Sequence, residues 1–254
     1  AQVVRILADA RVRESGDRFV SDWVHLSRLD AMVRDPDLFP DWDPAIGVAM
    51  AVETRTFFEQ LLFDRNQPVR ELFRAQFTFV SPELATYYGL GTPDPATGEV
   101  DVSAVPERGG ILTHGSVLTI GGNESSMVSR GLFMLDTFLC GTISSPPDGV
   151  DTTPPGLEPG KSQRFYSEQR VANDACTGCH SIMEPVSWGL ERFLADGRYY
   201  ETDHFGNALQ EDGFVQVPGV EATEYDNVEE LGEILASAEG VQSCFAQKNL
   251  QFAL

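Results

Sequence analysis

Residues 170–193 have the sequence RVANDACTGCHSIMEPVSWGLERF, in which Cys176 and Cys179 are followed directly by His180. At the start of a helix this spacing presents both sulfurs to one edge of a flat ring. The two thiols can then form thioethers with the vinyl groups of haem, and the imidazole can bind the iron as proximal ligand. The segment therefore predicts one covalently bound haem c, with His180 as a metal ligand.

Three other interpretations of the cysteine pair remain open. A zinc site would need two more Cys or His at similar local spacing, and the remaining candidates are scattered through the chain: Cys140, Cys244, His25, His114 and His204. A thioredoxin-like redox pair would need a βαβ context, whereas a proline-rich stretch precedes this one. The motif can also arise by chance.

The composition limits the class of protein. The chain has 254 residues, of which 42% are hydrophobic, as in a packed globular protein. Its 18 basic and 39 acidic residues give a formal net charge of −21, which repels nucleic acid and anionic lipid. No apolar run approaches the roughly 18–20 residues of a membrane span. We therefore expect neither nucleic-acid binding nor a transmembrane segment, and a soluble protein partner would be basic.

Apolar residues recur at helical spacing through most of the chain, which predicts a mainly α fold. Residues 91–123 are rich in glycine and proline, and we expect a loop there with at most a short strand pair near 111–120. The stretch 141–160 has the composition of an extended linker. The expected helices are 2–32, 45–64, 69–80, 81–90, 125–140, 188–197 and 227–254, the last broken near Gly240.

Capping residues support several of these boundaries. Pro44 suits the first turn of the second helix. Ser81 is the expected N-cap of residues 81–90, which we expect to end at Gly89. Ser125 or Ser126 is the expected cap of the helix that follows the glycine-rich section. The helix that carries the cysteine pair is expected to stop and restart around Pro185.

The motifs after the cysteines occur in a characteristic order: an acidic-proline pair at Glu184, the segment GLERF at 189–193 and the turn DGRY at 196–199. This order resembles the haem segment of the planctomycete-type cytochromes. These are large, mostly uncharacterised multi-domain proteins that are also abundant in myxobacteria. The stretches 108–147, 19–30, 53–90 and 241–254 resemble other parts of the same proteins.

The resemblance implies that residue 1 lies inside a larger helical domain and that the chain is the C-terminal part of a longer protein or complex. We accordingly expect a helical domain plus a cytochrome c-like haem domain, with an irregular loop and short-strand section between them. The expected boundaries are 1–90 for the helical region, 91–160 for the loop-rich segment with one helix and the linker, and 161–254 for the haem domain.

The sequence leaves three options for the second axial ligand of the iron. Met127 follows a flexible glycine-rich loop, from which its thioether could reach the iron. His114, in an apolar strand-like stretch, is the other candidate, and an open iron is a third option. His204 is expected on the surface and His25 in a structural role.

The identity of the second ligand distinguishes two possible functions. Histidine–methionine ligation leaves no site for a substrate and favours electron transfer to a redox partner protein or a neighbouring cytochrome subunit. An open iron would allow a haem enzyme of peroxidase-like or small-substrate oxidase type, with His114, Glu107 and Arg108 as local acid–base candidates. A purely structural haem is a further alternative.

Once the haem cysteines are set aside, Cys140 and Cys244 remain as a candidate disulfide. Such a pair fits an oxidising compartment, so we expect a periplasmic or extracellular protein. An acidic loop also offers oxygen ligands for calcium, but its spacing is not that of an EF-hand. We expect a solvated loop with helix-capping aspartates, which are Asp35, Asp37, Asp41 and Asp43.

Overall fold

The computed structural model describes residues 5, 9, 11–146, 149–150, 152–153, 155–215 and 222–254. The first half contains α2 (Arg11–Trp23), η1 (Leu26–Leu29), α3 (Pro44–Glu59), η2 (Gln60–Asp64), η3 (Val69–Phe73), β1 (Phe77–Phe79), α4 (Pro82–Tyr88), β2 (Glu99–Asp101), η4 (Ile111–Thr113) and α5 (Gly115–Leu118). The second half contains α6 (Met127–Leu139), α7 (Gln163–Ala172), α8 (Thr177–Met183), η5 (Pro185–Leu190), β3 (Gly213–Val215), β4 (Thr223–Tyr225), α9 (Val228–Ser237) and α10 (Glu239–Ala253).

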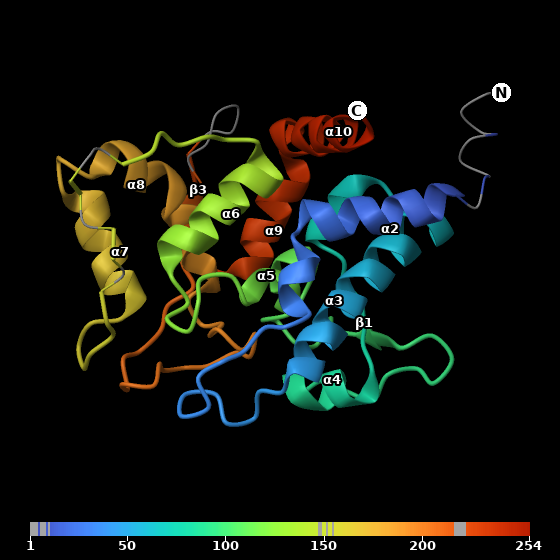
Figure 1. The fold of residues 1–254 in the computed structure, drawn as a ribbon, viewed down its shortest axis with the longest axis horizontal. Coiled ribbons are helices and arrows are strands. Elements are labelled where there is room, and N and C mark those ends of the chain that lie inside the picture. The colour runs from blue at the N-terminus through green and yellow to red at the C-terminus, as the bar shows by residue number, and fades with distance from the viewer. Residues whose placement is uncertain are drawn as a thin grey trace.

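The predicted mainly α fold is confirmed. Helices α2 and α3 lie at one end of the molecule, α7 and α8 lie at the other, and α6 runs between them (Figure 1). The strands form two small antiparallel sheets, β1 with β2 and β3 with β4. No helix in the described part of the chain is both long and apolar enough to span a bilayer.

The predicted caps are confirmed, but the first expected helix, over 2–32, is not continuous: α2 ends at Trp23 and η1 follows. Asp43 caps α3 and Pro44 occupies its first turn, while Ser81 caps α4, which ends at Gly89 with a φ of 73°. Ser126 is the cap of α6. The expected apolar positions Val4 and Leu7 lie outside the described residues.

The expected helix over 69–80 is wrong in its second half. Only η3 is helical, and Phe77, Thr78 and Phe79 form β1, which pairs with β2. Two aromatic residues around a β-branched one favour a pleated strand. The side chains of Phe77 and Phe79 both lie under the guanidinium of Arg65, at 4.3 and 5.4 Å from the ring centroids.

The strand expected near 111–120 is also wrong, because this stretch forms η4 and α5. Its backbone is satisfied locally: the amide of Thr113 donates to the carbonyl of Gly110, and the amide of Leu118 to that of His114. The helix expected over 188–197 is likewise only η5, after which the amide of Leu194 donates to the carbonyl of Arg198 in a turn at Gly197.

The C-terminal part follows the prediction closely. Helices α9 and α10 are separated at Ala238, close to the expected break. Cys140, which ends α6, forms a disulfide with Cys244 on α10 across a Cα–Cα distance of 5.4 Å. The candidate pair is therefore confirmed, and α10 lies across α6 and α2 (Figure 1).

One large hydrophobic cluster contains residues from all three segments expected from the sequence. It includes Phe58 from α3, Leu112 from η4, and Leu190 and Leu235 from the C-terminal part. The three segments thus share a core, and their boundaries stay predictions.

Arg130 on α6 is 1% exposed and lies in the middle of this core. Its guanidinium donates to the carbonyls of Leu118 at 2.6 Å, Ile120 at 3.1 Å, Leu190 at 2.7 Å and Leu194 at 3.4 Å. Burial, and to a lesser extent the charge of a neighbouring arginine, lowers the pKa of Arg130 to about 9. One side chain therefore joins α6 to the chain before it and to the chain after α8.

The next residue, Gly131, brings α8 against α6. A Cβ at this position would overlap the backbone carbonyl of Met183, the last residue of α8. The two helix backbones can approach this closely only because Gly131 has no side chain. Arg130 and Gly131 together position the helix that bears the cysteine pair.

We expect Arg130→Lys to lower the free energy of unfolding by on the order of 3 kcal/mol, because one ammonium cannot reach all four carbonyls and leaves buried acceptors without a donor. Chemical denaturation followed by circular dichroism measures this. The matched control is Arg18→Lys, at a side chain 64% exposed, which should change stability by less than about 0.5 kcal/mol. Equal effects of the two changes would contradict the role of Arg130.

Candidate functional site

The two cysteines lie at the start of α8. Cys176 immediately precedes the helix and Cys179 lies in its first turn, where its amide donates to the carbonyl of Cys176 at 3.2 Å. Both thiols are free and half-buried. A Cβ added to Gly178 between them would meet no atom within 4 Å, so this side of the helix is open.

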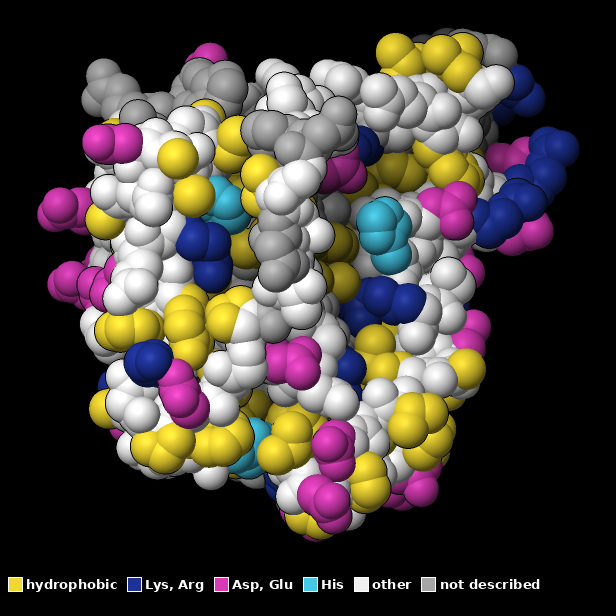
Figure 2. Space-filling view, turned by 60° about the vertical axis from the view of Figure 1, so that its left-hand side comes forward, with side chains coloured by type: hydrophobic (Ala, Val, Ile, Leu, Met, Phe, Trp, Pro, Cys, Tyr) yellow, Lys and Arg dark blue, Asp and Glu magenta, His cyan; other side chains and the backbone are white. Residues whose placement is uncertain are grey.

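Figure 2 turns the end of the molecule that carries α7 and α8 toward the viewer. On this face, hydrophobic, histidine, basic and acidic side chains are interspersed. The cysteine-bearing helix therefore lies on a mixed surface.

His180 contacts the buried carboxylate of Glu184, which forms an ion pair with Arg170. Its Nδ1 lies 2.5 Å from Oε1 of Glu184, which is fully buried. Arg170 donates from Nε to Oε1 and from Nη2 to Oε2 of the same carboxylate, both at 2.7 Å. The Nε2 atom of His180 makes no hydrogen bond with the part of the chain that the structure describes.

Local sequence explains this arrangement. His180 and Glu184 are four residues apart, so they share one face of a helix, and Pro185 then starts η5. Helix α7 brings Arg170 onto that face. Neither Glu184 nor Arg170 was predicted as a site residue, although the i, i+4 spacing of His180 and Glu184 indicates the first.

Helix α7 is itself fixed by buried contacts. Glu191 accepts hydrogen bonds from the Ser162 hydroxyl at 2.9 Å and from the Arg164 amide at 3.0 Å. The guanidinium of Arg164 lies 3.8 Å from the ring centroid of Trp188. These contacts anchor the start of α7 against the segment that follows α8.

The donor set fits a covalently attached haem. Two free thiols at this spacing, followed by an imidazole with one nitrogen available, are the groups that such a haem requires. The other two cysteines form a disulfide. Within the described residues, no three His, Cys, Asp or Glu side chains are grouped so that they could hold a metal ion. A zinc site at the cysteine pair would therefore lack its further ligands.

The acidic loop before α3 likewise contains no such group of metal ligands among the described residues. Asp43 caps α3, Asp35 accepts from the amide of Asp37 at 2.9 Å, and Asp41 pairs with Arg198 at 3.0 Å. These aspartates act as caps and surface ion-pair partners.

Met127 is the first residue of α6 and is fully buried. The hydroxyl of Ser187 donates to its carbonyl at 3.0 Å and lies 3.6 Å from its sulfur. Ser187 belongs to η5, directly after α8. The structure thus brings Met127 against the segment that follows the cysteine pair.

His114 lies elsewhere. Its Nδ1 is 3.1 Å from the hydroxyl of Thr54 on α3, its ring packs on Phe57 at a centroid distance of 4.7 Å, and the residue is 2% exposed. Its buried Nε2 has no partner in the described part of the chain. None of its hydrogen-bond or ring partners lies on α8.

The other two histidines are exposed. His25 precedes η1 in a left-handed conformation with a φ of 54°. His204 packs the edge of its ring against Phe39 at 4.9 Å. The surface position expected for His204 is confirmed.

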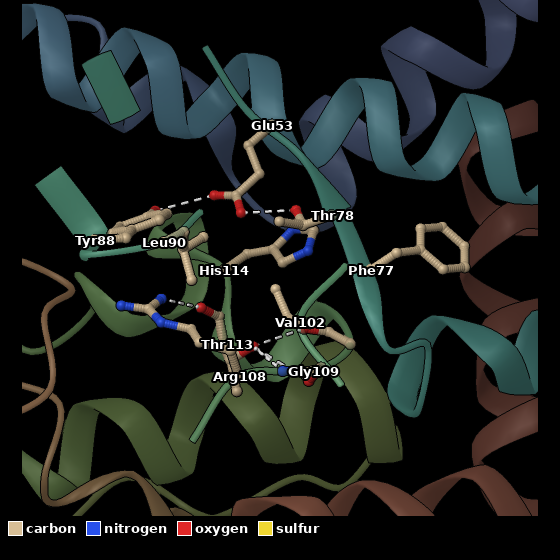
Figure 3. Close-up of a pocket in the computed structure, with 11 residues that line it drawn as sticks. Glu53, Phe77, Thr78, Tyr88, Leu90, Val102, Arg108, Gly109, Thr113 and His114 are labelled. Carbon is tan, nitrogen blue, oxygen red and sulfur yellow. Dashed lines mark hydrogen bonds between the residues drawn. The ribbon is translucent and has the colours of Figure 1, made fainter. Parts of the chain in front are cut away.

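A second polar cluster surrounds His114. A small cavity of about 10 Å³ lies between α3, β1, α4 and the 108–114 segment, with room for about one water molecule; Figure 3 shows the residues that line it. Glu53 accepts from the hydroxyls of Thr78 and Tyr88, both at 2.9 Å. Arg108 also lines the cavity and donates to the carbonyl of Thr113 at 2.8 Å. Two of the acid–base candidates, His114 and Arg108, therefore lie together, whereas Glu107 is not among the lining residues.

Burial shifts the titratable groups of this cluster. It raises the pKa of Glu53 to about 7, a shift that the charge of Arg108 and the two hydroxyl donors oppose. Burial, with a smaller contribution from Arg108, lowers the pKa of His114 to about 3. His114 is therefore neutral near pH 7. Glu53 was not predicted as a site residue; it lies among the buried residues of α3, and a carboxylate on that face was its signal in the sequence.

Comparison with known proteins gives two matches. Residues 1–90 match the family model PSD4, a protein of unknown function (DUF1592), and residues 108–203 match PSCyt3, a protein of unknown function (DUF1588). No curated protein and no solved structure matches the chain. The cavity is lined from both matched segments, and the cysteine pair with its histidine lies in the second.

We expect Glu53→Gln to remove a pH-dependent part of the stability. The pKa of Glu53 is raised from 4.5 to about 7, so between these values the folded protein binds more protons than the unfolded chain. The free energy of unfolding of the parent should therefore fall by roughly 3 kcal/mol relative to that of the variant as the pH rises through this range. Below pH 4.5 and above pH 7 the difference in free energy of unfolding between the parent and the variant should be constant. Denaturant titrations of both proteins at a series of pH values measure it, and a difference that does not change with pH would contradict the raised pKa.

Proposed function

We propose that this chain is the haem-binding part of an extracytoplasmic monohaem c-type cytochrome that transfers electrons. The observation that carries the proposal is the pair of free thiols on α8, followed by an imidazole held at one nitrogen. Each thiol would add across one vinyl group, forming a carbon–sulfur bond while the thiol proton goes to the other vinyl carbon. No electrons are exchanged in this attachment. The short name of the family matched by residues 108–203, PSCyt3, points in the same direction.

In this proposal Cys176 and Cys179 would hold haem c and Nε2 of His180 would bind its iron; the haem would supply the group that takes up and gives back one electron. Met127 is the proposed second ligand, because it packs against the segment that follows α8. Ligation would require its sulfur to leave Ser187. His114 is the other candidate, and its partners on α3 make it the weaker one.

The proposed location and partner follow from charge and cysteine chemistry. The disulfide between Cys140 and Cys244 suits an oxidising compartment, the periplasm or the exterior. A net charge of −21 favours a basic soluble redox partner, although a neighbouring cytochrome subunit in a fixed complex would not need that complementarity. We further propose that the chain functions as part of a longer protein or complex.

The first test is the optical spectrum of protein produced with a c-type haem maturation system. We expect reduced c-type bands that persist after denaturation and acid–acetone extraction, since thioethers keep the haem on the chain. The control is Cys176→Ala with Cys179→Ala, which should release the haem under the same treatment. Parent protein without haem bands, although folded by circular dichroism, would contradict the proposal.

The second test identifies the distal ligand and separates electron transfer from enzyme chemistry. We expect the reduced parent to ignore carbon monoxide, because both axial positions are taken. Met127→Leu should open one position and make the spectrum respond to carbon monoxide, whereas His114→Gln should behave as the parent. A parent spectrum that is high-spin and responds to carbon monoxide would contradict two-ligand electron transfer and favour a haem enzyme with an open site.

A further inference from the structure

Glu184 differs from Glu191, a second buried carboxylate seven residues later in the chain. Glu191 accepts two backbone amides, those of Arg164 and Gln210, together with the hydroxyl of Ser162, and so fixes the path of the chain. Within the described part of the chain, by contrast, the oxygens of Glu184 are bound by side chains, the imidazole of His180 and the guanidinium of Arg170. The full charge of Glu184 therefore acts on one histidine and one arginine.

This contact determines which nitrogen of His180 is available. A carboxylate is an acceptor, so Nδ1 of the imidazole carries the proton and donates to Oε1 of Glu184. The lone pair of the neutral ring is then on Nε2. A carboxylate behind a metal-bound histidine also increases the electron donation of the ring to the metal. Glu184 is completely buried, so solvent screens this effect little.

Arg170 stabilises the buried carboxylate of Glu184 and reduces the effect of its negative charge on His180. A buried carboxylate that had only a neutral imidazole as partner would be costly, and a bidentate guanidinium offsets part of that cost. The side chain of Arg170 is 22% exposed, so the pair extends from the buried carboxylate toward the surface of α7. The net effect on His180 is that of a nearby anion reduced by a more distant cation.

We propose that Glu184 is a positioning residue that holds His180 by Nδ1 and lowers the reduction potential of the attached haem, and that Arg170 limits this lowering. The inference rests on the proposed function, because it concerns the iron that His180 would bind. A negative charge and a more basic ligand both stabilise the ferric state over the ferrous state.

The test is an optical redox titration of the haem-loaded protein and three variants. Glu184→Gln keeps the size and one acceptor oxygen but removes the charge, and we expect it to favour reduction at least tenfold, which is about 59 mV for one electron. Glu168→Gln is the matched control: it removes the same charge from an α7 residue whose side chain is 50% exposed and pairs with Arg164. It should change the equilibrium constant between the ferric and ferrous states less than threefold.

Arg170→Gln supplies the second measurement. It leaves the charge of Glu184 unopposed, so we expect a shift toward the ferric state, opposite in sign to that of Glu184→Gln. A site that was only loosened would move both variants in the same direction. Shifts of the same sign, or a Glu184→Gln potential equal to that of Glu168→Gln, would overturn the inference.

The two proposals fail in different ways. Parent protein that carries no covalent haem contradicts the proposed function before any potential is measured. Parent protein that carries haem, with variants whose potentials do not move as described, leaves the cytochrome proposal standing and removes the role of Glu184.

Discussion

The arrangement of the molecule depends on one buried cation. The guanidinium of Arg130 is taken out of water, so it must find acceptors inside the protein, and the carbonyls that it binds come from 118–120 and 190–194. Helix α6 therefore has to lie between these two stretches. Once it does, Gly131 lets the end of α8 approach the α6 backbone. The position of the cysteine pair follows from this constraint, although none of these groups belongs to the motif.

The interior is richer in positive charge than the composition suggests. Arginines 34, 108, 130 and 164 are all buried, each less than a tenth exposed, and their guanidinium groups are bound largely to backbone carbonyls or lie over aromatic rings. Five acidic side chains, Glu53, Glu184, Glu191, Asp196 and Asp203, are buried as well, so the surface keeps most of the formal charge of −21. Acidic side chains are visible across the face in Figure 2. The preference for a basic partner rests on this distribution.

The sequence was sufficient where a local signal decides the structure. The caps at Asp43, Ser81 and Ser126 could be predicted because residue type and spacing specify them. The pairing of Cys140 with Cys244 could be predicted only by elimination, after Cys176 and Cys179 had been set aside. Residues 77–79 could not, because β1 exists only through its pairing with β2 some twenty residues later. The site divides in the same way. The thiols and His180 form a local motif, whereas Arg170 reaches Glu184 only after α7 has folded back onto α8.

The position of Met127 determines where the molecule would have to move for a thioether to reach the iron. The far end of α6 is fixed by the disulfide of Cys140, and its start is fixed by Arg130 and Gly131, which follow Met127 by three and four residues. The chain before Met127 is different, because Gly121, Gly122 and Ser125 have positive φ values of 107°, 69° and 54°. Two of these three are glycines, which change such angles at little cost. A rearrangement that released Met127 from Ser187 would therefore be confined to residues 121–127 and would leave the His180–Glu184–Arg170 contacts in place.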